Sequence, residues 1–358
     1  MSLHVITTTA EFETLATEWE GLNDEPLRSF DWHFAWWNHF GDDKELRIYC
    51  LRIDGKTIGI APFFVDHWLG QSRIRFIGSG DTCTDYAQIL CEEKYLARFI
   101  AAIDADLAEE LEISMIELEG VTDNDSAPIC NEFLATRYWK YSRDLEPTWV
   151  LDLPDSWDEF YQGSKKHLKR KIKRANSRLN SPEIKVKSTD DGLDFETAFE
   201  ILVELHQDRF ESKGELGVFA DQRFYDFLIT AARKLYAKGK VEIVIASENG
   251  EPFIAQIYLK SQDGPQLYQA GIRSSKMHLE PGHLLLTYGI RHAIENGAAH
   301  FDFLRGDQPY KPYWGAKPRE LYNTRLVSKK IFPSAVNKSY QFLRIVKNAC
   351  TAFARATV

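Results

Sequence analysis

QLYQAGIRSSKMHLEPGHLLLTYGIRHAIENGAAHFDFLRGDQPYKPYWGAK, residues 266–317, is the stretch that decides the fold. The aromatic and aliphatic residues of 266–272 predict a short strand. After a polar connection, residues 281–297 carry apolar side chains at helical spacing between a proline in the first turn and a closing glycine. Residues 301–304 then alternate as a half-buried strand does. The stretch therefore predicts a strand, a helix and a second strand in succession.

The turn at Pro281, Gly282, His283 and Leu284 has the features of an anion site. Backbone amides in the first turn of a helix have no partner within the helix, and the helix dipole places partial positive charge there. A phosphate group is therefore favoured at such a turn. The same four residues also fit an ordinary turn and helix start, and the sequence alone does not choose between the two interpretations.

The chain has 358 residues and 44% hydrophobic content, which is enough for two domains of ordinary size. A net charge of -9 argues against a globally basic, DNA-binding protein. The five cysteines show an odd count and no metal-type spacing, which favours a reducing compartment and predicts no metal site. No secretory signal heads the chain, and no apolar run approaches the roughly 20 residues of a membrane-spanning helix. We therefore expect a cytoplasmic protein.

Two stretches share the pattern of a β-hairpin. Residues 46–65 and 241–259 each contain two apolar runs, joined by Asp54-Gly55 in the first and Asn249-Gly250 in the second. Asp-Gly and Asn-Gly dipeptides are strong hairpin signals. Their recurrence indicates an internal repeat. We therefore expect two related modules of the α/β class, in which helices and mixed β-sheets combine in the α+β manner.

Two further segments fit both a functional and a structural interpretation. Residues 29–41 predict a helix with an aromatic face, which either packs in the core or holds a sugar or acyl chain. The polar loop at residues 78–86 follows a strand, and it either lines an acceptor cleft or ends that strand. The residues of this loop that prompt the functional interpretation are Gly78, Gly80, Asp81, Asp85 and Tyr86.

Basic residues gather in two segments of this acidic chain. Residues 164–178 read SKKHLKRKIKRANSR, and they predict either a helix that contacts a polyanion, phosphate-bearing substrate or anionic lipid, or a solvated helix between domains. Residues 331–358 predict a basic amphipathic helix. That helix either docks on the protein's own surface or makes a peripheral contact at the inner face of a membrane.

The sequences PGHLLL at residues 281–286 and FDFLRGDQPYKPYWGAK at residues 301–317 together resemble the GNAT acyltransferase superfamily. Within it, the chain looks like the branch associated with cellulose and exopolysaccharide biosynthesis, called CelD-like, which is similar in turn to the Fem-type aminoacyltransferases. The most specific part is the run with Tyr310, Lys311, Trp314 and Gly315. The resemblance implies two tandem GNAT-like modules, with these limits: an N-terminal module at 1–153, a basic linker helix at 154–182, a C-terminal acyltransferase module at 183–330 and the amphipathic helix at 331–358.

The resemblance also implies an acyl-CoA co-substrate, such as acetyl-CoA, and direct attack of an acceptor on its thioester. The strand with Tyr268, Gln269 and Gly271 would bind the thioester or the pantetheine arm, because a glycine lets a ligand approach the backbone closely. The turn at 281–284 would bind the pyrophosphate. The protein must then hold both reactants and accommodate a developing oxyanion.

Three residues are candidates for the general base that deprotonates the acceptor, namely Asp302, Asp307 and His206. Lys311 completes the predicted catalytic set, because it can stabilise negative charge or hold a substrate phosphate. The structural alternative for Asp302 and Arg305 is an internal ion pair that pins the end of the strand, and for His206 it is packing. The residues predicted to contact the acceptor are Arg209, Arg305, Tyr310 and Trp314.

The predicted function is therefore acyl transfer to a sugar, sugar-nucleotide or amino acceptor, in exopolysaccharide or cell-envelope biosynthesis. One alternative is a Fem-like transferase that takes its acyl group from aminoacyl-tRNA. The basic residues 164–178 favour that alternative, whereas the net charge and the RGDQPYK loop at 305–311 oppose it. Another alternative is a catalytically silent GNAT-like module that binds a biosynthetic partner or a lipid surface. DNA is not an expected partner.

Overall fold

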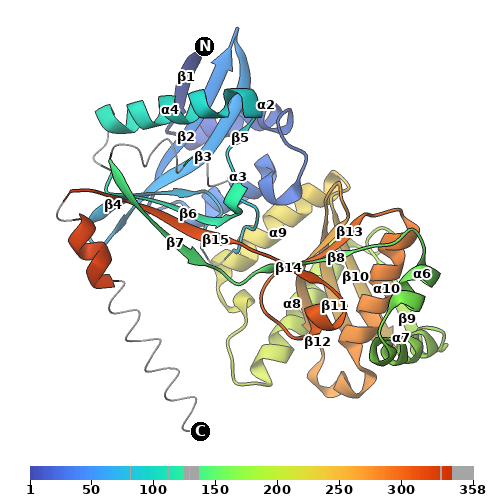
Figure 1. Ribbon diagram of the computed structural model, residues 1–358. Helices are drawn as coiled ribbons and strands as arrows, with labels where there is room; N and C mark the ends of the chain where they lie inside the picture. Colours follow the sequence, from blue (N-terminus) through green and yellow to red (C-terminus); the bar gives the residue numbers. More distant parts are fainter. Residues whose placement is uncertain (81, 111–112, 125–128, 130–136, 331–332, 341–358) are drawn as a thin grey trace.

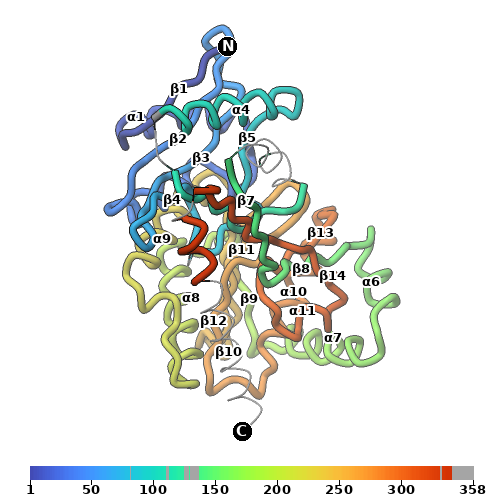
Figure 2. Tube along the Cα trace, turned by 60° about the vertical axis from the view of Figure 1, so that its left-hand side comes forward, coloured from blue at the N-terminus to red at the C-terminus, as the bar shows by residue number. Residues whose placement is uncertain are grey.

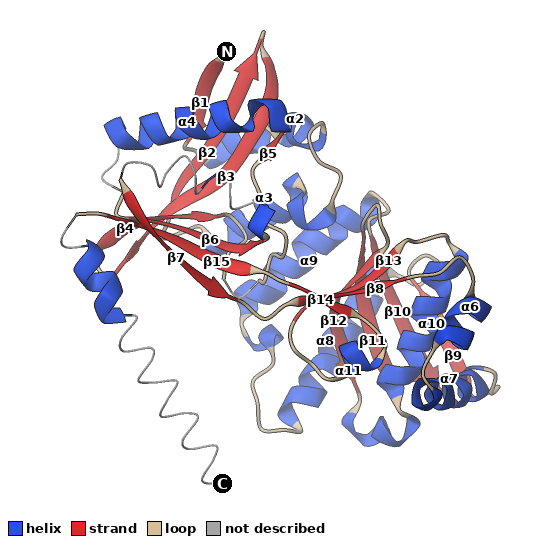
Figure 3. Ribbon diagram, in the orientation of Figure 1, coloured by secondary structure: helices blue, strands red, loops and turns tan. Residues whose placement is uncertain are grey.

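The computed structural model describes residues 1–80, 82–110, 113–124, 129, 137–330 and 333–340. Two mixed β-sheets form the body of the molecule, and helices cover them (Figure 1, Figure 3). Each sheet is antiparallel apart from one parallel pair, β4 with β6 in the first sheet and β12 with β13 in the second. The predicted fold class, α/β with mixed sheets, is confirmed.

The first sheet has the strand order β1-β2-β3-β4-β6-β15-β7, and β5 pairs with β3. Helix α4 covers one face of this sheet and helix α3 the other. The strands are β1 (Ser2–Ile6), β2 (Glu45–Ile53), β3 (Lys56–Trp68), β4 (Gln71–Phe76), β5 (Leu90–Cys91), β6 (Met115–Val121), β7 (Tyr138–Asp144) and β15 (Tyr322–Ser328). The helices are α1 (Thr9–Thr14), α2 (Ala16–Glu20), η1 (Pro26–Arg28), α3 (Phe30–Phe40) and α4 (Glu93–Glu110).

The second sheet has the strand order β14-β8-β13-β12-β11-β10-β9. Helices α8 and α9 lie on one face, and α6, α7 and α10 lie on the other (Figure 2). The strands are β8 (Thr148–Asp152), β9 (Ile184–Ser188), β10 (Val241–Glu248), β11 (Glu251–Lys260), β12 (Pro265–Ile272), β13 (His300–Arg305) and β14 (Lys317–Arg319). The helices are α6 (Trp157–Gly163), α7 (Lys166–Leu179), α8 (Phe195–Glu211), η2 (Val218–Ala220), α9 (Gln222–Ala237), η3 (Ser274–Leu279), α10 (Pro281–Glu295) and α11 (Tyr310–Tyr313).

The two sheets follow one plan, with one strand of each exchanged. Position by position, β1-β2-β3-β4-β6-β15-β7 corresponds to β9-β10-β11-β12-β13-β8-β14. The sixth position of the first sheet is filled by β15, and the sixth position of the second sheet by β8. This correspondence supports the predicted internal repeat. The module limits stay a prediction, but the sheets do not divide between residues 153 and 183, because β8 pairs with β13 and β14 of the second module, and β15 pairs with β6 and β7 of the first.

Both predicted hairpins are confirmed as β2–β3 and β10–β11. At their turns, Asp54 has φ 49° and Gly55 φ 80°, while Asn249 has φ 51° and Gly250 φ 87°. Positive φ at both central residues defines the turn that matches the right-handed twist of two-stranded ribbons. The two dipeptides therefore placed these strands correctly.

Helices α3 and α9 pack against each other and join the two modules through one core. Trp32 is fully buried, with its ring centroid 4.9 Å from that of Phe227 on α9 and 5.1 Å from that of Tyr268 on β12. Trp36 is also buried. The aromatic face of residues 29–41 is therefore core, which is the structural interpretation of that pattern.

Two helices occupy the region predicted as one linker helix. Helix α6 ends at Gly163, and after a break α7 begins at Lys166. Helix α7 buries Leu168, Ile172 and Ala175 and packs along α10, so it belongs to the surface of the second module. Of the predicted C-terminal helix, residues 333–340 are helical, and residues 331–332 and 341–358 lie outside the described part of the chain.

Candidate active site

The neighbouring strands β12 and β13 meet at a single pair and then part. That pair is Gln266 with Asp302, near the start of β12. Beyond it, β12 has a bulge in which Tyr268 lacks a partner on β11, and β13 has an irregularity at 303–304 opposite β8. Bulges redirect the backbone and side chains, and they are common beside active sites. The two strands thus enclose a wedge-shaped gap, and the backbone groups on its two sides have no partner on the opposite strand.

The bulge in β13 is held from both ends by two of the predicted catalytic residues. Leu304 has φ 53°, a left-handed conformation that costs free energy for a residue with a side chain. Its N–H donates to Asp302 Oδ1 at 2.8 Å, and its carbonyl accepts from Lys311 Nζ at 3.0 Å. Lys311 Nζ also donates to the carbonyl of Arg305 at 2.9 Å. Asp302 and Lys311 therefore stabilise the strained peptide.

Asp302 is 8% exposed and faces a residue of the first module. The Tyr86 hydroxyl donates to Asp302 Oδ2 at 2.7 Å and lies 2.8 Å from Thr148 Oγ1. Burial raises the pKa of Asp302 to about 6, since removal from water disfavours the carboxylate, and the negative charge of Asp85 adds to this effect. A carboxylate with a pKa near 6 can take up a proton from an acceptor at neutral pH.

Lys311 is buried rather than open to a ligand, with only 1% of its surface exposed. Burial lowers its pKa to about 8, and the carboxylates of Asp85 and Asp302 act in the opposite direction. Its ammonium group already contacts two backbone carbonyls. The direct contacts of Lys311 are thus structural, and its charge acts on the site through space.

Arg305 forms the strand-pinning ion pair that was the structural alternative, but its partner is Asp85 and not Asp302. Its Nε donates to Asp85 Oδ1 at 2.7 Å, and its backbone N–H donates to Asp85 Oδ2 at 2.9 Å. Asp85 is 1% exposed, and burial raises its pKa although Arg305 opposes the effect. The loop at 78–86 therefore reaches across to the second module. Of this loop, Asp81 lies outside the described residues.

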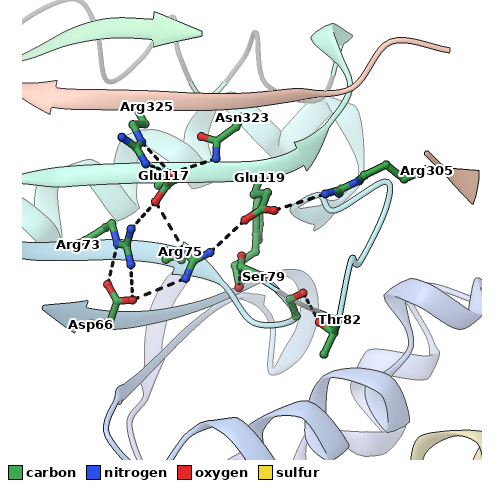
Figure 4. Close-up of polar contacts among 12 residues, drawn as sticks. Asp66, Arg73, Arg75, Ser79, Thr82, Glu117, Glu119, Arg305, Asn323 and Arg325 are labelled. Carbon is green, nitrogen blue, oxygen red and sulfur yellow. Dashed lines mark hydrogen bonds and ion pairs between the residues drawn. The ribbon is translucent and has the colours of Figure 1, made fainter. Parts of the chain in front are cut away.

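A chain of ion pairs continues from Arg305 over the first sheet (Figure 4). Arg305 Nη1 lies 3.4 Å from Glu119, whose other oxygen is 3.0 Å from Arg75 Nη2. Arg75 also lies 3.8 Å from Glu117 on β6, and Glu117 is 2.6 Å from Arg325 on β15. The network therefore connects β4, β6 and β15 of the first sheet with the end of β13 in the second sheet.

The start of α10 meets the basic face of α7. Glu280 precedes the helix with φ 52°, and within the described residues no side chain caps the free amides of the first turn. The Glu280 carboxylate pairs with Lys171 and lies 3.2 Å from Arg178 and 3.5 Å from Arg174. Lys171 and the other two cations hold the pKa of Glu280 below its ordinary value. Three cations therefore surround one carboxylate at the positive end of a helix dipole.

Aromatic side chains form a wall beside this turn. The His283 ring lies 5.5 Å from Tyr313 and 5.9 Å from Trp314, between ring centroids, and Tyr313 lies 4.6 Å from His167 on α7. Trp314 is 1% exposed, and its Nε1 has no hydrogen-bond partner among the described residues, nor has His283 Nδ1. Trp314 is thus a core residue next to the first turn of α10, and its indole N–H is without a hydrogen-bond acceptor among the described residues.

The remaining predicted residues are spread around the second module. His206 is buried on α8, stacked on Phe210 at 4.5 Å, and burial lowers its pKa. This is a packing environment. Arg209 is half-buried, and Asp307 and Tyr310 are exposed in or next to the loop after β13. The structure brings Asp302, Lys311 and Arg305 together, while the described contacts of His206 lie in an aromatic cluster apart from them.

Gly271 is required by helix packing rather than by a ligand. A methyl group at this position would lie 2.4 Å from the backbone nitrogen of His206 and 2.7 Å from the Leu202 carbonyl, both on α8. We expect Gly271→Ala to lower the free energy of unfolding by about 1–3 kcal/mol through overpacking. Gly282→Ala is the control, because nothing lies within 4 Å of a methyl group there and alanine favours a helix. Urea unfolding of both variants checks this, and equal stabilities would contradict it.

Sequence reasoning missed one residue of the site and the contact of another. Gln266 was noted only as the start of a strand. Tyr86 was named in the loop that either lines an acceptor cleft or ends a strand, but its hydrogen bond to Asp302 was not foreseen. Gln266 is 7% exposed, and its Oε1 has no partner among the described residues. A polar residue at the start of a strand gives no signal by itself, because its position beside Asp302 depends on the pairing of β12 with β13.

Comparison with known proteins agrees with the geometry. Residues 163–312 match a family model described as an acetyltransferase (GNAT) domain. No curated protein matches the chain. The crystal structure of FemX aligns with a TM-score of 0.61 at 12% identity, covering 90% of this chain and 97% of that one. A conserved protein of unknown function from Bacteroides thetaiotaomicron VPI-5482 aligns at 0.57 and 11% identity, covering 90% and 100%.

A third solved structure has a similar fold. It is the C-terminal domain of a putative lysylphosphatidylglycerol synthetase from Agrobacterium fabrum, with a TM-score of 0.54 at 8% identity, covering 93% of this chain and 95% of that one.

Among the described residues, no helix is long and apolar enough to cross a membrane. In the same part of the chain, no three His, Cys, Asp or Glu side chains form a group that could hold a metal ion. Residues 163–312 are therefore similar to GNAT acetyltransferase domains, within an overall fold similar to that of FemX.

Proposed function

We propose that the protein transfers an acyl group from acyl-CoA to a sugar, sugar-nucleotide or amino acceptor, by direct attack in a ternary complex. The observation that carries the proposal is the start of α10, where uncapped amides and three cations of α7 meet beside the ends of β12 and β13. A diphosphate is the chemical group that such a turn binds best. CoA carries a diphosphate at a distance from its reactive thioester, which suits a phosphate turn beside diverging strands.

The donor would bind along the wedge between β12 and β13. Its pyrophosphate would accept hydrogen bonds from the amides of Gly282 and His283, with Lys171 supplying positive charge. The pantetheine arm would follow the strand at 268–271, which has no partner on β13 beyond the pair of Gln266 with Asp302. Orienting the thioester in this way removes much of the entropic cost of the reaction.

In the proposed mechanism Asp302 is the general base. The acceptor amine or hydroxyl gives its proton to the Asp302 carboxylate as it forms a bond to the thioester carbon. The tetrahedral intermediate then collapses, the carbon–sulfur bond breaks, and the CoA thiolate leaves and takes a proton from solvent. Lys311, whose pKa of about 8 leaves it charged at neutral pH, favours the developing oxyanion through space.

The acceptor proposed from the sequence belongs to exopolysaccharide or cell-envelope biosynthesis. This part of the proposal rests on the resemblance of the run with Tyr310, Lys311 and Trp314 to the CelD-like branch. Tyr310 is exposed and Trp314 is buried beside His283, so the run lies next to the proposed donor turn. We keep a glycan precursor as the acceptor class on this basis.

A second candidate is transfer from aminoacyl-tRNA. One observation favours it, since α7 carries exposed cations that make no ion pair with Glu280, among them Lys166, Arg170 and Lys173. The similarity to FemX is a similarity of fold and does not choose between donors. The two candidates differ in their salt dependence, because RNA binding through phosphates weakens steeply as salt rises.

Two substitutions with opposite expected signs test the donor turn. We expect Lys171→Gln to weaken acetyl-CoA binding by about two- to fivefold, because it removes a cation beside the pyrophosphate. Glu280→Gln should strengthen binding by about the same factor, because it removes the anion that competes for Lys171 and Arg178. Isothermal titration at low salt measures both.

Lys173→Gln is the matched control, since it removes one exposed charge from the same helix. Its acetyl-CoA affinity should stay close to that of the unmodified protein. If Lys171→Gln and Glu280→Gln both weaken binding, the pair supports the turn structurally and does not compete with a phosphate, and the proposed donor position is wrong.

A further inference from the structure

A pocket of about 230 Å³ lies between the two modules and includes the paired residues Gln266 of β12 and Asp302 of β13. Its lining includes Arg28, Tyr86, Gln266, His300, Asp302 and Arg319. They come from η1 and the 78–86 loop of the first module, and from β12, β13 and β14 of the second. The volume is below the range typical for drug-sized ligands, so the pocket suits a small molecule.

Two arginines in this pocket have no acidic partner. Among the described residues, neither Arg28 nor Arg319 forms an ion pair, whereas Arg305 on β13 is paired with Asp85. The Arg319 guanidinium lies over the Tyr86 ring, 5.7 Å from its centroid, which fixes its position beside Asp302. A guanidinium group presents several donors in one plane and binds carboxylate or phosphate groups in a bidentate manner.

Gln266 is a second, independent sign of a ligand. It is 7% exposed and lines the pocket, yet its Oε1 has no hydrogen-bond partner in the described part of the chain. A buried amide oxygen without a partner costs free energy, and native proteins seldom leave one unpaired. A donor on a bound molecule, such as an N–H group, would satisfy it. Gln266 also pairs with Asp302, so such a donor would lie beside the proposed base.

We propose that this pocket binds the acceptor, and that the acceptor is a small amine with a carboxylate or phosphate group. That the bound molecule is an acceptor rests on the proposed acyl transfer. That the pocket binds such a molecule does not depend on it. The anionic group lies between Arg28 and Arg319. The amine faces Gln266 Oε1 and Asp302, and it loses its proton to Asp302 when it attacks the thioester.

The side chains at the rim favour an amine over a purely anionic ligand. Glu25 and Asp263 line the same pocket as the two arginines. A lining with both carboxylates and guanidinium groups matches a molecule with both charges, and it disfavours a ligand with negative charge alone.

Matched probes test the pocket without any donor present. Each pair has the same amine with and without the anionic group: L-serine with L-serinamide, and glucosamine 6-phosphate with glucosamine. Thermal unfolding and titration calorimetry on the full chain are run at millimolar probe. We expect one probe with the carboxylate or phosphate group to raise the melting temperature, and its counterpart without that group to have no effect. Arg28→Gln and Arg319→Gln should each raise the Kd of that probe about tenfold or more.

Arg233→Gln is the control, because this arginine lies on α9 and pairs with Glu196 far from the pocket. It should bind the probe normally, and all three variants should bind acetyl-CoA normally. The proposal is overturned by equal binding of the probes with and without the acidic group, by no binding of either probe with that group, or by unchanged binding in both pocket variants. Probe binding without any acetyl-CoA binding keeps the pocket and rejects the proposed donor.

Discussion

Asp302→Asn should lower kcat for acyl transfer by about 10²–10⁴-fold, the range expected for loss of a general base. The substitution changes little else, because the asparagine oxygen can still accept the Leu304 N–H and its amide nitrogen can donate to the Tyr86 oxygen. Activity is measured as CoA release with a saturating acceptor. The control is Asp307→Asn, which removes a carboxylate from the exposed loop after β13 and should keep most activity.

The role of Asp302 as base also predicts the direction in which the rate changes with pH. The raised pKa of Asp302, about 6, means that the carboxylate form dominates above pH 6 and the inactive acid form below it. We expect kcat/KM to rise with pH through about 6 and to fall again above about 8, where Lys311 loses its charge, and the residual activity of Asp302→Asn to lack the rise. A profile through pH 6 that is unchanged in the variant would exclude Asp302 as the base.

Stability separates loss of chemistry from loss of fold in this variant. Folding raises the pKa of the Asp302 carboxyl group. The free energy of unfolding therefore falls as the pH rises from the pKa of the unfolded state through about 6, because the folded protein must then hold a buried charge. Asparagine carries no charge and avoids this cost. At pH 8 we therefore expect Asp302→Asn to unfold at the same temperature as the unmodified protein or at a higher one.

Arg305→Met should cause the largest loss of stability, about 3–5 kcal/mol in the free energy of unfolding, because it leaves Asp85 as a buried charge without its partner. Asp85 is 1% exposed, and the Arg305 side chain is 12% exposed. Arg233→Met is the matched control. That arginine pairs with Glu196 at a surface where both side chains are about half exposed, so its loss should cost only about 0–1 kcal/mol.

The double variant Asp85→Asn with Arg305→Met tests the cause. Neutralising the orphaned carboxylate should restore part of the loss, so the double variant should be more stable than Arg305→Met alone. Denaturant unfolding of the two single variants and the double variant gives the coupling directly. If the double variant is less stable than Arg305→Met, the destabilisation does not come from an unpaired Asp85.

Local signals in the sequence were sufficient for the hairpins and for the strand and helix around residue 281. Asp54-Gly55 and Asn249-Gly250 have the positive φ angles that their turn type needs, and α10 begins at Pro281 as the pattern predicts. These features depend on a few adjacent residues. A reader of the sequence alone can therefore find them.

The exchange of β8 and β15 between sheets could not be predicted in this way. Each is a short strand with a sequence that suits any sheet, and its partners lie far away along the chain. The pair of Asp85 with Arg305 joins residues 220 positions apart, so the charge of Arg305 indicated an ion pair but not its partner. For the same reason, the sequence did not show that Gly271 packs against α8.

The measurement that tests the central claim most directly is thermal unfolding of the protein with acetyl-CoA, with a longer acyl-CoA, and with adenosine as the control. A ligand that binds only the folded state stabilises it by about 2.7 kcal/mol at a concentration of 100 Kd. We expect the melting temperature to rise with the concentration of either thioester and to stay unchanged with adenosine. No rise at saturating thioester would contradict an acyl-CoA donor at the start of α10.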